Sequence, residues 1–321
     1  MTNGILRSVV LLIVDVAMVP VIFLAALPMR LFRRIGAARM PISRHVFRMC
    51  GYWPLRRHYY DPLIDPRDLS SPLDTPRSLS AIDWNETEQL RRLAGMRYQA
   101  ETRVFLDAPA SGELRFQYDN SSFLSGDADY LYGFVRSSRP SRIVEVGCGN
   151  STLLIHAAVT ANRADDPSYS CEHICIEPYE QPWLERLNVR VLRQRVEHTS
   201  FETFETLGPG DFLFIDSSHV IRPCGDVLFQ VLEVLPRLRS GVYVHFHDIF
   251  SPRHYLTEWI TNWGYLWNEQ YLMEGFLSFN RDFRIVGALN YLQHNHYDAV
   301  AAICVNHSRA LEPGSLYLQR V

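Results

Sequence analysis

Between residues 116 and 321, short apolar runs alternate with helical patterns, and this alternation constrains the fold more than any other feature. The apolar runs are RIVEVG, HICIEP, VRVLRQ, DFLFID and GVYVHFHD, and patterns such as DADYLYGFVRSS, STLLIHAAVTAN and DVLFQVLEVLPRL separate them. Strands that alternate with helices predict a parallel sheet covered on both faces. The final segments, FRIVGALNY and SLYLQRV, break this rhythm and predict an antiparallel pair at the end of the chain.

Polar residues gather where these predicted strands end. In open α/β sheets, ligands bind at the carboxyl ends of the strands. This rule selects residues 145–149, Glu177, residues 216–219 and residues 245–248.

The first of these segments predicts the ligand. Gly147 and Gly149 let the backbone approach a ligand closely, but Thr152 stands where a dinucleotide fingerprint needs its third glycine. Glu145 would repel a pyrophosphate and attract an ammonium group, and Glu177 can accept hydrogen bonds from both ribose hydroxyls. An amino-acid head and a ribose without phosphate describe S-adenosylmethionine.

The motifs VEVGCGNST, CIEP, FIDSSH and VHFHDIF resemble those of class I S-adenosylmethionine-dependent methyltransferases. They are most similar to a bacterial branch linked to glycan or secondary-metabolite modification. The resemblance implies a Rossmann-like, seven-stranded α/β sheet with a reversed last strand. It also implies a set of cofactor-binding residues. These are Glu145, Gly147 and Gly149 at the methionine portion, Asn150 in the same turn, Glu177 at the ribose, and Val196 and Glu197 near the adenine.

Two further strand ends carry acids next to histidines. Asp216 and Asp248 end neighbouring parallel strands, His219 follows the first acid, and His247 precedes the second. Such a group suits two roles, and the sequence leaves both open. Asp216, Asp248 and His247 would hold a divalent cation such as Mg²⁺. Alternatively, the group would remove a proton from an acceptor hydroxyl.

Catechol-type methyltransferases, which share the fold, hold their metal on two Asp and one Asn and use a lysine base. Here Ile249 stands at the Asn position, and all 32 basic residues are arginine. His219 falls near the lysine position, so we expect it to be the general base, with Asp216 and Asp248 as its catalytic partners.

The absence of lysine also excludes phosphate loops and Schiff-base chemistry. Strand alternation places His245 and His247 on one face and Asp248 on the other, unless the strand ends before them. We expect His245 to be a hydrogen-bonded strand histidine.

The N-terminal segment predicts a membrane anchor. Residues 9–27 are apolar except for Asp15 and Pro20, which is about the length of a membrane span. Arginines follow from Arg30 onward with no acid before Asp61, so the positive-inside rule places the remainder in the cytoplasm, on an inner or cytoplasmic membrane. We expect residues 5–34 to contact the bilayer. An interfacial helix, a buried helix of a soluble fold and a cleaved signal are the alternatives.

We therefore predict three regions: residues 1–40 as anchor helix and basic flank, residues 41–115 as linker with helical and extended parts, and residues 116–321 as the methyltransferase domain. Within the second region, residues 58–83 contain four prolines and predict an extended linker. Residues 84–105 predict a helix, with Asp83 or Asn85 as its cap.

The expected function is O-methylation of a hydroxyl on a glycan, lipid-linked or secondary-metabolite acceptor at the cytoplasmic membrane face. The acceptor pocket is expected from residues 118–130, 251–255 and 267–276, where Trp267, Tyr271 and Phe276 can stack on a ring. The alternatives are a cephalosporin hydroxylase-like enzyme, a dinucleotide oxidoreductase and a non-catalytic membrane scaffold. No dense basic stripe predicts nucleic-acid binding.

Overall fold

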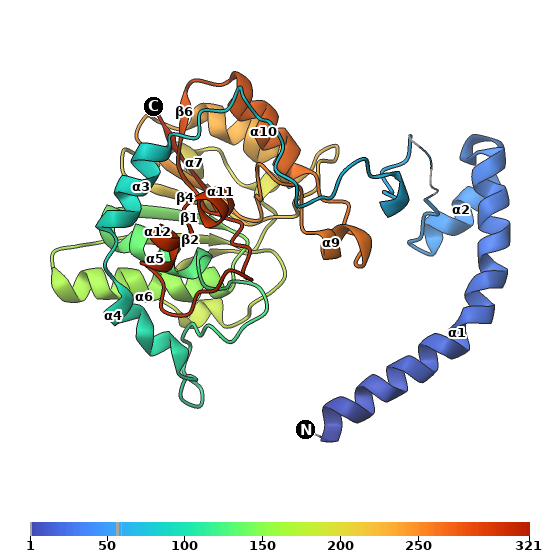
Figure 1. Cartoon of the computed structure of the whole chain (residues 1–321), viewed down its shortest axis with the longest axis horizontal. Coiled ribbons are helices and arrows are strands. Elements are labelled where there is room, and N and C mark those ends of the chain that lie inside the picture. Colours follow the sequence, from blue (N-terminus) through green and yellow to red (C-terminus); the bar gives the residue numbers. More distant parts are fainter. Residues whose placement is uncertain (1, 56–57, 59) are drawn as a thin grey trace. The chain divides into compact units, whose positions relative to one another are not determined.

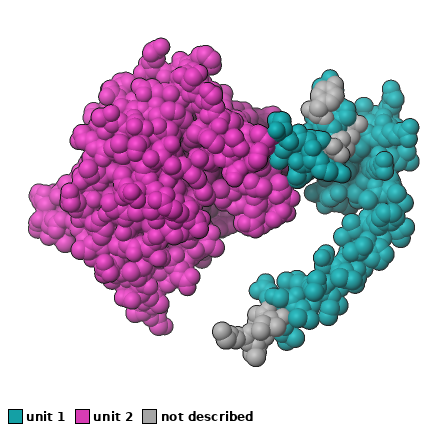
Figure 2. Space-filling view, viewed as in Figure 1, with its two compact units in different colours: residues 1–70 teal, residues 71–321 magenta. Residues whose placement is uncertain are grey.

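The computed structural model describes residues 2–55, 58 and 60–321, and it describes side chains from residue 6 onward. The chain forms two compact units, Met1–Ser70 and Ser71–Val321 (Figure 2). The three predicted regions stay a prediction, and the division between the units falls within the predicted linker.

The first unit is built around a long apolar helix, α1 (Thr2–Ile35), followed by the short helix α2 (Pro41–Met49). Residues Leu6–Ile35 of α1 are long and apolar enough to cross a membrane, and a signal sequence near an N-terminus shares these features. The ring of Phe32 packs edge-on against Phe47 of α2, with 4.8 Å between centroids. This contact attaches α2 to the end of α1.

The second unit contains a seven-stranded sheet in the order β3-β2-β1-β4-β5-β7-β6. The pairs among β1 to β5 are parallel, whereas β7 runs antiparallel to both β5 and β6. The structure therefore confirms the α/β sheet with its reversed last strand. The strands are β1 (Arg142–Val146), β2 (Glu172–Ile176), β3 (Arg190–Leu192), β4 (Phe212–Ile215), β5 (Tyr243–Phe246), β6 (Phe283–Ala288) and β7 (Leu316–Arg320).

Helices cover both faces of this sheet (Figure 1). Alternate strand residues face opposite sides, so Val144 belongs to one buried apolar cluster and Ile143 to the other. The first cluster lies under α7 (Glu202–Glu205), α8 (Asp226–Leu228) and α10 (Glu269–Phe279). The second cluster lies under α3 (Glu86–Gly95), α5 (Asp127–Ser138), α6 (Asn150–Asp165), α11 (Leu289–Asn295) and α12 (Tyr297–Ala301).

The helix predicted over residues 84–105 is interrupted in the structure. Helix α3 ends at Gly95, and a separate short helix, α4 (Gln99–Thr102), follows. Asn85 occupies the N-cap position of α3, but its amide reaches across to donate to the carbonyl of Ile285 at 2.8 Å. The tertiary contact therefore replaces the expected side-chain cap. A further short helix, α9 (Thr257–Thr261), precedes α10.

Candidate functional site

The turn after β1 is shaped by a close approach to β4. Gly147 has φ +76°, and a Cβ on it would lie 1.8 Å from the carbonyl oxygen of Asp216. Only glycine fits there, because the neighbouring strand end leaves no room for a side chain. A Cβ on Gly149 would meet nothing nearer than the Gln181 amide at 3.9 Å. The protein backbone itself, rather than a ligand, therefore requires the first glycine.

Glu145 lies fully buried beneath this turn. Its carboxylate accepts hydrogen bonds from the Ser151 and Thr152 hydroxyls at 2.7 and 3.0 Å, and it lies 2.7 Å from His173 Nε2. Thr152 Oγ1 also accepts from the Gly149 amide at 3.0 Å. Gly149 thus takes the N-cap position of α6. Glu145 lines neither of the two cavities that open beside this turn. Its hydrogen bonds instead hold the start of α6 against the sheet.

Two cavities open along the carboxyl ends of β1, β2 and β4. The first is about 460 Å³ and the second about 560 Å³, and Gly147, Glu177 and Asp216 line both. Asn150 and Gly149 face the first cavity, and Asn150 donates to the Ser122 hydroxyl at 3.0 Å. The two cavities form what we name the cofactor cleft.

Glu177 is held rigidly at the centre of the cofactor cleft. Its Oε1 accepts from the amides of Tyr179 and Glu180 at 2.9 and 3.0 Å, and Oε2 accepts from the Cys148 amide at 3.3 Å. Val196 and Glu197 line the second cavity together with Glu177. The structure thus brings these three predicted residues to one cavity.

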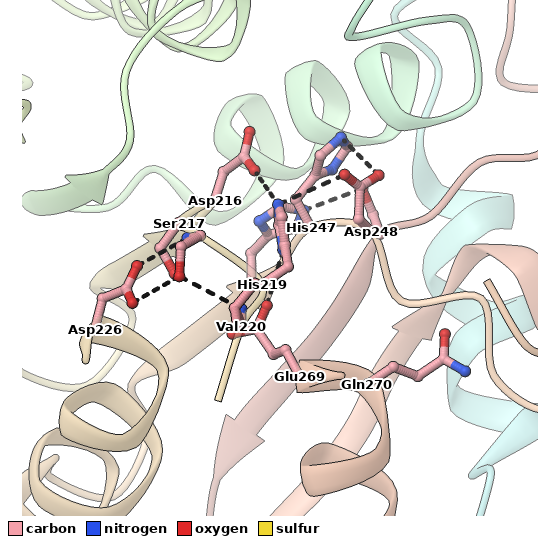
Figure 3. A network of polar contacts seen from close by, with 12 residues as sticks. Asp216, Ser217, His219, Val220, Asp226, His247, Asp248, Glu269 and Gln270 are labelled. Atoms are coloured by element: carbon pink, nitrogen blue, oxygen red, sulfur yellow. Dashed lines mark hydrogen bonds and ion pairs between the residues drawn. The ribbon is translucent and has the colours of Figure 1, made fainter. Parts of the chain in front are cut away.

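His219 lies beside Asp216, which lines the cofactor cleft, and contacts three carboxylates (Figure 3). Its Nε2 lies 3.2 Å from Asp216 Oδ1 and 3.6 Å from Asp248 Oδ2, and its Nδ1 lies 2.9 Å from Glu269 Oε2. Both His219 and Asp248 adopt left-handed backbone conformations, with φ +58°. Strained positions of this kind persist where the surrounding structure fixes them, as it does here.

The charges around His219 shift its pKa in the direction opposite to the effect of burial. Burial lowers the pKa of His219, but the hydrogen bonds to Asp216 and Glu269 and the charge of Asp248 together raise it well above its usual value. Burial also raises the pKa of the Asp248 carboxyl to about 6. Asp216 behaves oppositely: burial would raise its pKa, but His247 and His219 lower it overall. The surrounding carboxyl groups therefore favour the protonated form of His219.

The two remaining histidines differ in surroundings. Strand β5 ends at Phe246, so His247 and Asp248 can approach each other, and His247 Nε2 lies 3.7 Å from Asp248 Oδ1. His247 also packs on Phe123 at 4.9 Å between ring centroids. His245 is fully buried, stacks on Phe214 and shares a 3.0 Å hydrogen bond with the Ser315 hydroxyl, so the prediction of a hydrogen-bonded strand histidine is confirmed.

Among the described residues, the metal-ligand types that converge at this strand edge are Asp216, His219 and Asp248. One ligand atom from each lies within 4.8 Å of the others. The structure thus groups both predicted acids with His219, whereas the predicted third ligand, His247, lies outside this group.

An aromatic cavity of about 400 Å³ adjoins this group and is named the acceptor cavity. His247 and Asp248 line one end, and Trp259, Trp263 and Trp267 line the wall. The ring of Trp267 also contacts His219, with centroids 4.4 Å apart. The cavity therefore places a ring-binding surface beside the acid and histidine group.

The acceptor cavity agrees only partly with the residues predicted for it. Trp267 lines it, as expected. Tyr271 instead packs against Tyr255 and His254, and Phe276 packs on Phe283 in the core. These side chains lie on faces of α10 that point away from the cavity, because a helix turns by 100° per residue.

Three site residues were not singled out from the sequence, although Asp127 and Glu269 lie in segments expected to build the acceptor pocket. Glu269 is buried at the start of α10, and Asp127 at the start of α5 accepts from the Ser315 amide at 2.9 Å while lining the acceptor cavity. His173 was also missed, although it follows Glu172 on β2 and its side chain meets Glu145. A signal for Asp127 existed, since an acid begins the predicted helix.

Comparisons with known proteins agree with this site. Residues 144–249 match the family model described as a methyltransferase domain. An uncharacterized protein of Archaeoglobus fulgidus is 27% identical over 162 residues, which cover 47% of this chain and 72% of that protein.

Two solved structures show distant likeness. An O-methyltransferase from Bacillus cereus in complex with SAH is 14% identical, with a TM-score of 0.38 over 73% of this chain and 91% of that chain. A putative protein-L-isoaspartate O-methyltransferase from Plasmodium falciparum, in complex with S-adenosyl-L-homocysteine, is 11% identical. Its TM-score is 0.29 over 50% of this chain and 83% of that chain. At these scores the two structures carry no further argument.

The family match spans β1 to the end of β5, which is the part of the sheet that builds the cofactor cleft. The surrounding sheet has the seven strands and the reversed strand that the resemblance implied. The narrower likeness to one bacterial branch stays a prediction. The match and the strand order together support a methyltransferase domain of the class I, S-adenosylmethionine-dependent type.

Proposed function

We propose that this protein is an S-adenosylmethionine-dependent O-methyltransferase that methylates a hydroxyl at the cytoplasmic face of a membrane. The observation that carries the proposal is the cofactor cleft, whose two cavities share Gly147, Glu177 and Asp216. The ribose would bind at Glu177, the adenine near Val196 and Glu197, and the methionine portion at the glycine turn.

The charge of the site favours a cationic cofactor. Four carboxyl groups, Asp127, Asp216, Asp248 and Glu269, surround His219 and His247. These four carboxyl groups outnumber the two imidazoles. A sulfonium ion entering beside Asp216 would relieve this excess, whereas a pyrophosphate would increase it.

The acceptor hydroxyl would lie between His219 and the acceptor cavity. Its oxygen attacks the methyl carbon as the carbon–sulfur bond breaks, which gives a methyl ether and the demethylated cofactor. The protein aligns the two groups and receives the hydroxyl proton. Glu269 fixes the orientation of the His219 ring through Nδ1, so that Nε2 faces Asp216 and Asp248. The surrounding carboxyl groups favour the protonated form of His219, and the ring acts as the base only in its neutral form.

The donors at this site also fit a divalent cation such as Mg²⁺. Asp216 Oδ1 and Asp248 Oδ2 supply the hard oxygen ligands that Mg²⁺ prefers, and His219 Nε2 completes the group. A bound Mg²⁺ would polarise the acceptor hydroxyl and lower its pKa. His219 would then serve as a ligand, so its two roles are exclusive.

The long apolar helix α1 supports attachment to a bacterial inner or cytoplasmic membrane. The arginines that follow it favour a cytoplasmic catalytic unit. The acceptor would then be a lipid-linked or glycan hydroxyl within reach of the membrane.

The test is transfer of a labelled methyl group from S-adenosylmethionine to a total lipid and glycolipid extract by the full chain in detergent. The wild type should label a component of the extract, and His219→Gln should lower the rate by about 10²-fold or more. His156→Gln, on α6 and away from the cofactor cleft, is the matched control. Equal rates for the wild type and His219→Gln would contradict the assigned role of His219. No labelling by the wild type would contradict a lipid or glycolipid acceptor.

A further inference from the structure

The first unit contains a cavity of about 720 Å³ at the end of the apolar helix α1. Three arginines, Arg30, Arg33 and Arg34, line it together with Tyr52. Residues three and four apart share one face of a helix, so the three guanidinium groups converge on the same side of α1. The cavity lies wholly within the first unit and is separate from the cofactor cleft.

The positive charges of these arginines are only partly paired with acidic side chains among the described residues. Arg33 forms an ion pair with Asp61. Arg30 and Arg34 form no ion pair with any residue that the structure describes, and no acidic residue occurs between positions 30 and 60. Guanidinium groups bind phosphate through paired hydrogen bonds in a fixed geometry. The cavity is therefore suited to a phosphate group.

Apolar residues complete the cavity wall. Ala26 and Met29 of α1 and Leu55 line it beside the arginines. The helix that leads to it is apolar, and its large apolar side chains from Val9 to Leu27 are exposed. A wall that is basic on one side and apolar on the other matches an amphiphile better than a fully hydrated anion.

Helix α2 presents a second apolar surface next to this cavity. Ile42, Val46 and Met49 lie on one face of α2 and are 81%, 51% and 75% exposed. Phe47, on another face, holds α2 against Phe32 of α1. The apolar face of α2 is therefore directed to the surroundings, as in helices that lie in a membrane interface.

We propose that the Arg30, Arg33 and Arg34 cavity binds the phosphate headgroup of an anionic membrane lipid, with the exposed face of α2 in the interface. The proposal rests on the membrane attachment proposed above and is independent of methyl transfer. The lipid would fix the depth and orientation of the end of α1.

The test is native mass spectrometry of the full chain in an uncharged detergent, with phosphatidylglycerol or phosphatidylcholine added. The wild type should retain phosphatidylglycerol in preference to phosphatidylcholine. Removing an arginine near the membrane surface weakens anionic-lipid binding about five-fold, so Arg30→Gln/Arg34→Gln should lose at least about ten-fold. Arg281→Gln/Arg284→Gln, which removes two exposed arginines of the second unit, should bind as the wild type does.

Equal retention of the two lipids, or unchanged binding by Arg30→Gln/Arg34→Gln, would overturn the proposal. A separate experiment adds inorganic phosphate as a competitor. If phosphate at low millimolar concentration displaces the lipid, the cavity is assigned to soluble phosphate instead. Sedimentation of the full chain with phosphatidylcholine vesicles reports the anchor by itself. A chain that fails to sediment therefore refutes the anchor, whereas a chain that sediments without lipid preference refutes only the lipid-phosphate site.

Discussion

The two sides of the candidate active site are built in different ways. On the cofactor side, Glu145, Glu177 and Gly147 lie within one residue of a strand end and are fixed by hydrogen bonds or backbone contacts. On the acceptor side, His219 and Glu269 come from segments 50 residues apart. They meet through a 2.9 Å contact between their side chains and a 3.2 Å hydrogen bond from the Glu269 amide to the His219 carbonyl. The cofactor side is thus a product of local structure, and the acceptor side is a product of tertiary packing.

This difference has a consequence for substitutions. Changes on the cofactor side disturb the backbone of the central strands, so they should affect stability and binding together. Changes on the acceptor side should affect the reaction with little effect on folding. The predictions below test that contrast.

The largest effect is expected for Gly147→Ala. The added Cβ would overlap the carbonyl oxygen of Asp216, and φ is +76°, so we expect a loss of about 2–5 kcal/mol in the free energy of unfolding. Gly149→Ala is the matched control, because its Cβ has space. Urea unfolding of both variants measures the difference. Similar stabilities would show that the close contact between the turn and β4 does not exist.

A large effect on rate alone is expected for Glu269→Gln. The glutamine amide can still accept a hydrogen bond from Nδ1 but carries no negative charge. It therefore no longer supports the imidazolium that forms when His219 takes up the hydroxyl proton, and we expect methyl transfer to slow by about 10²-fold. The KM for S-adenosylmethionine should not change, because Glu269 lies outside the cofactor cleft. Glu258→Gln, an acid at the start of α9, serves as the control. A rise in KM with an unchanged kcat would assign Glu269 to cofactor binding instead.

Metal binding gives a sharper test of the acceptor side. If Asp216 and Asp248 hold a divalent cation, Mn²⁺ should bind the wild type, as measured by electron paramagnetic resonance. Asp248→Asn should weaken this binding by about ten-fold or more, because it removes a charged oxygen ligand. Asp298→Asn, at an almost fully exposed acid, should bind as the wild type does. Chelator treatment that leaves methyl transfer unchanged would show that the reaction needs no metal.

A pH dependence of stability, spread over several pH units, is expected beneath the glycine turn. Burial lowers the pKa of His173, but Cys175 and Glu145 raise it to about 10 overall. The unfolded chain has a His pKa near 6.5, so the native state binds more protons between these values. The stabilisation is complete below about pH 6.5 and is lost as pH rises towards 10, by at most about 1.4 kcal/mol per pH unit.

The measurement for His173 is the stability difference between the wild type and His173→Gln from pH 7 to pH 10. This difference should shrink as the pH rises. His245→Gln is the control, because burial keeps the pKa of His245 well below its usual value and the residue stays neutral throughout. A constant difference for His173→Gln would mean that His173 is neutral in the folded protein.

The contrast between the two sides also explains what the sequence could predict. Glu177 and Asp216 follow apolar runs directly, so their position at the sheet edge follows from strand order alone. The burial of Glu145 could not be predicted, because an acid before a glycine turn can face either a ligand or the start of the next helix. Only the three-dimensional structure shows that Glu145 accepts hydrogen bonds from Ser151 and Thr152 and therefore faces the start of the next helix.

The residues of the acceptor side were harder to predict from the sequence, because their positions also depend on three-dimensional contacts. Trp259 and Trp263 lie between two segments that we expected to build the pocket, and their contribution depends on where α9 packs. The sequence gives no sign that the buried carboxyl of Glu269 would meet His219, because the helix that carries it has acids at several positions. Loop packing of this kind depends on contacts between segments distant along the chain.

The most direct measurement of the central claim is calorimetric titration of S-adenosylmethionine and of NAD into the full chain in detergent. Glu177→Ala is compared with Glu172→Ala, which removes an exposed acid at the opposite end of the same strand. The account predicts that S-adenosylmethionine binds, that NAD does not, and that only Glu177→Ala abolishes binding. Binding of NAD, or full binding of S-adenosylmethionine by Glu177→Ala, would contradict the assignment of the cofactor cleft.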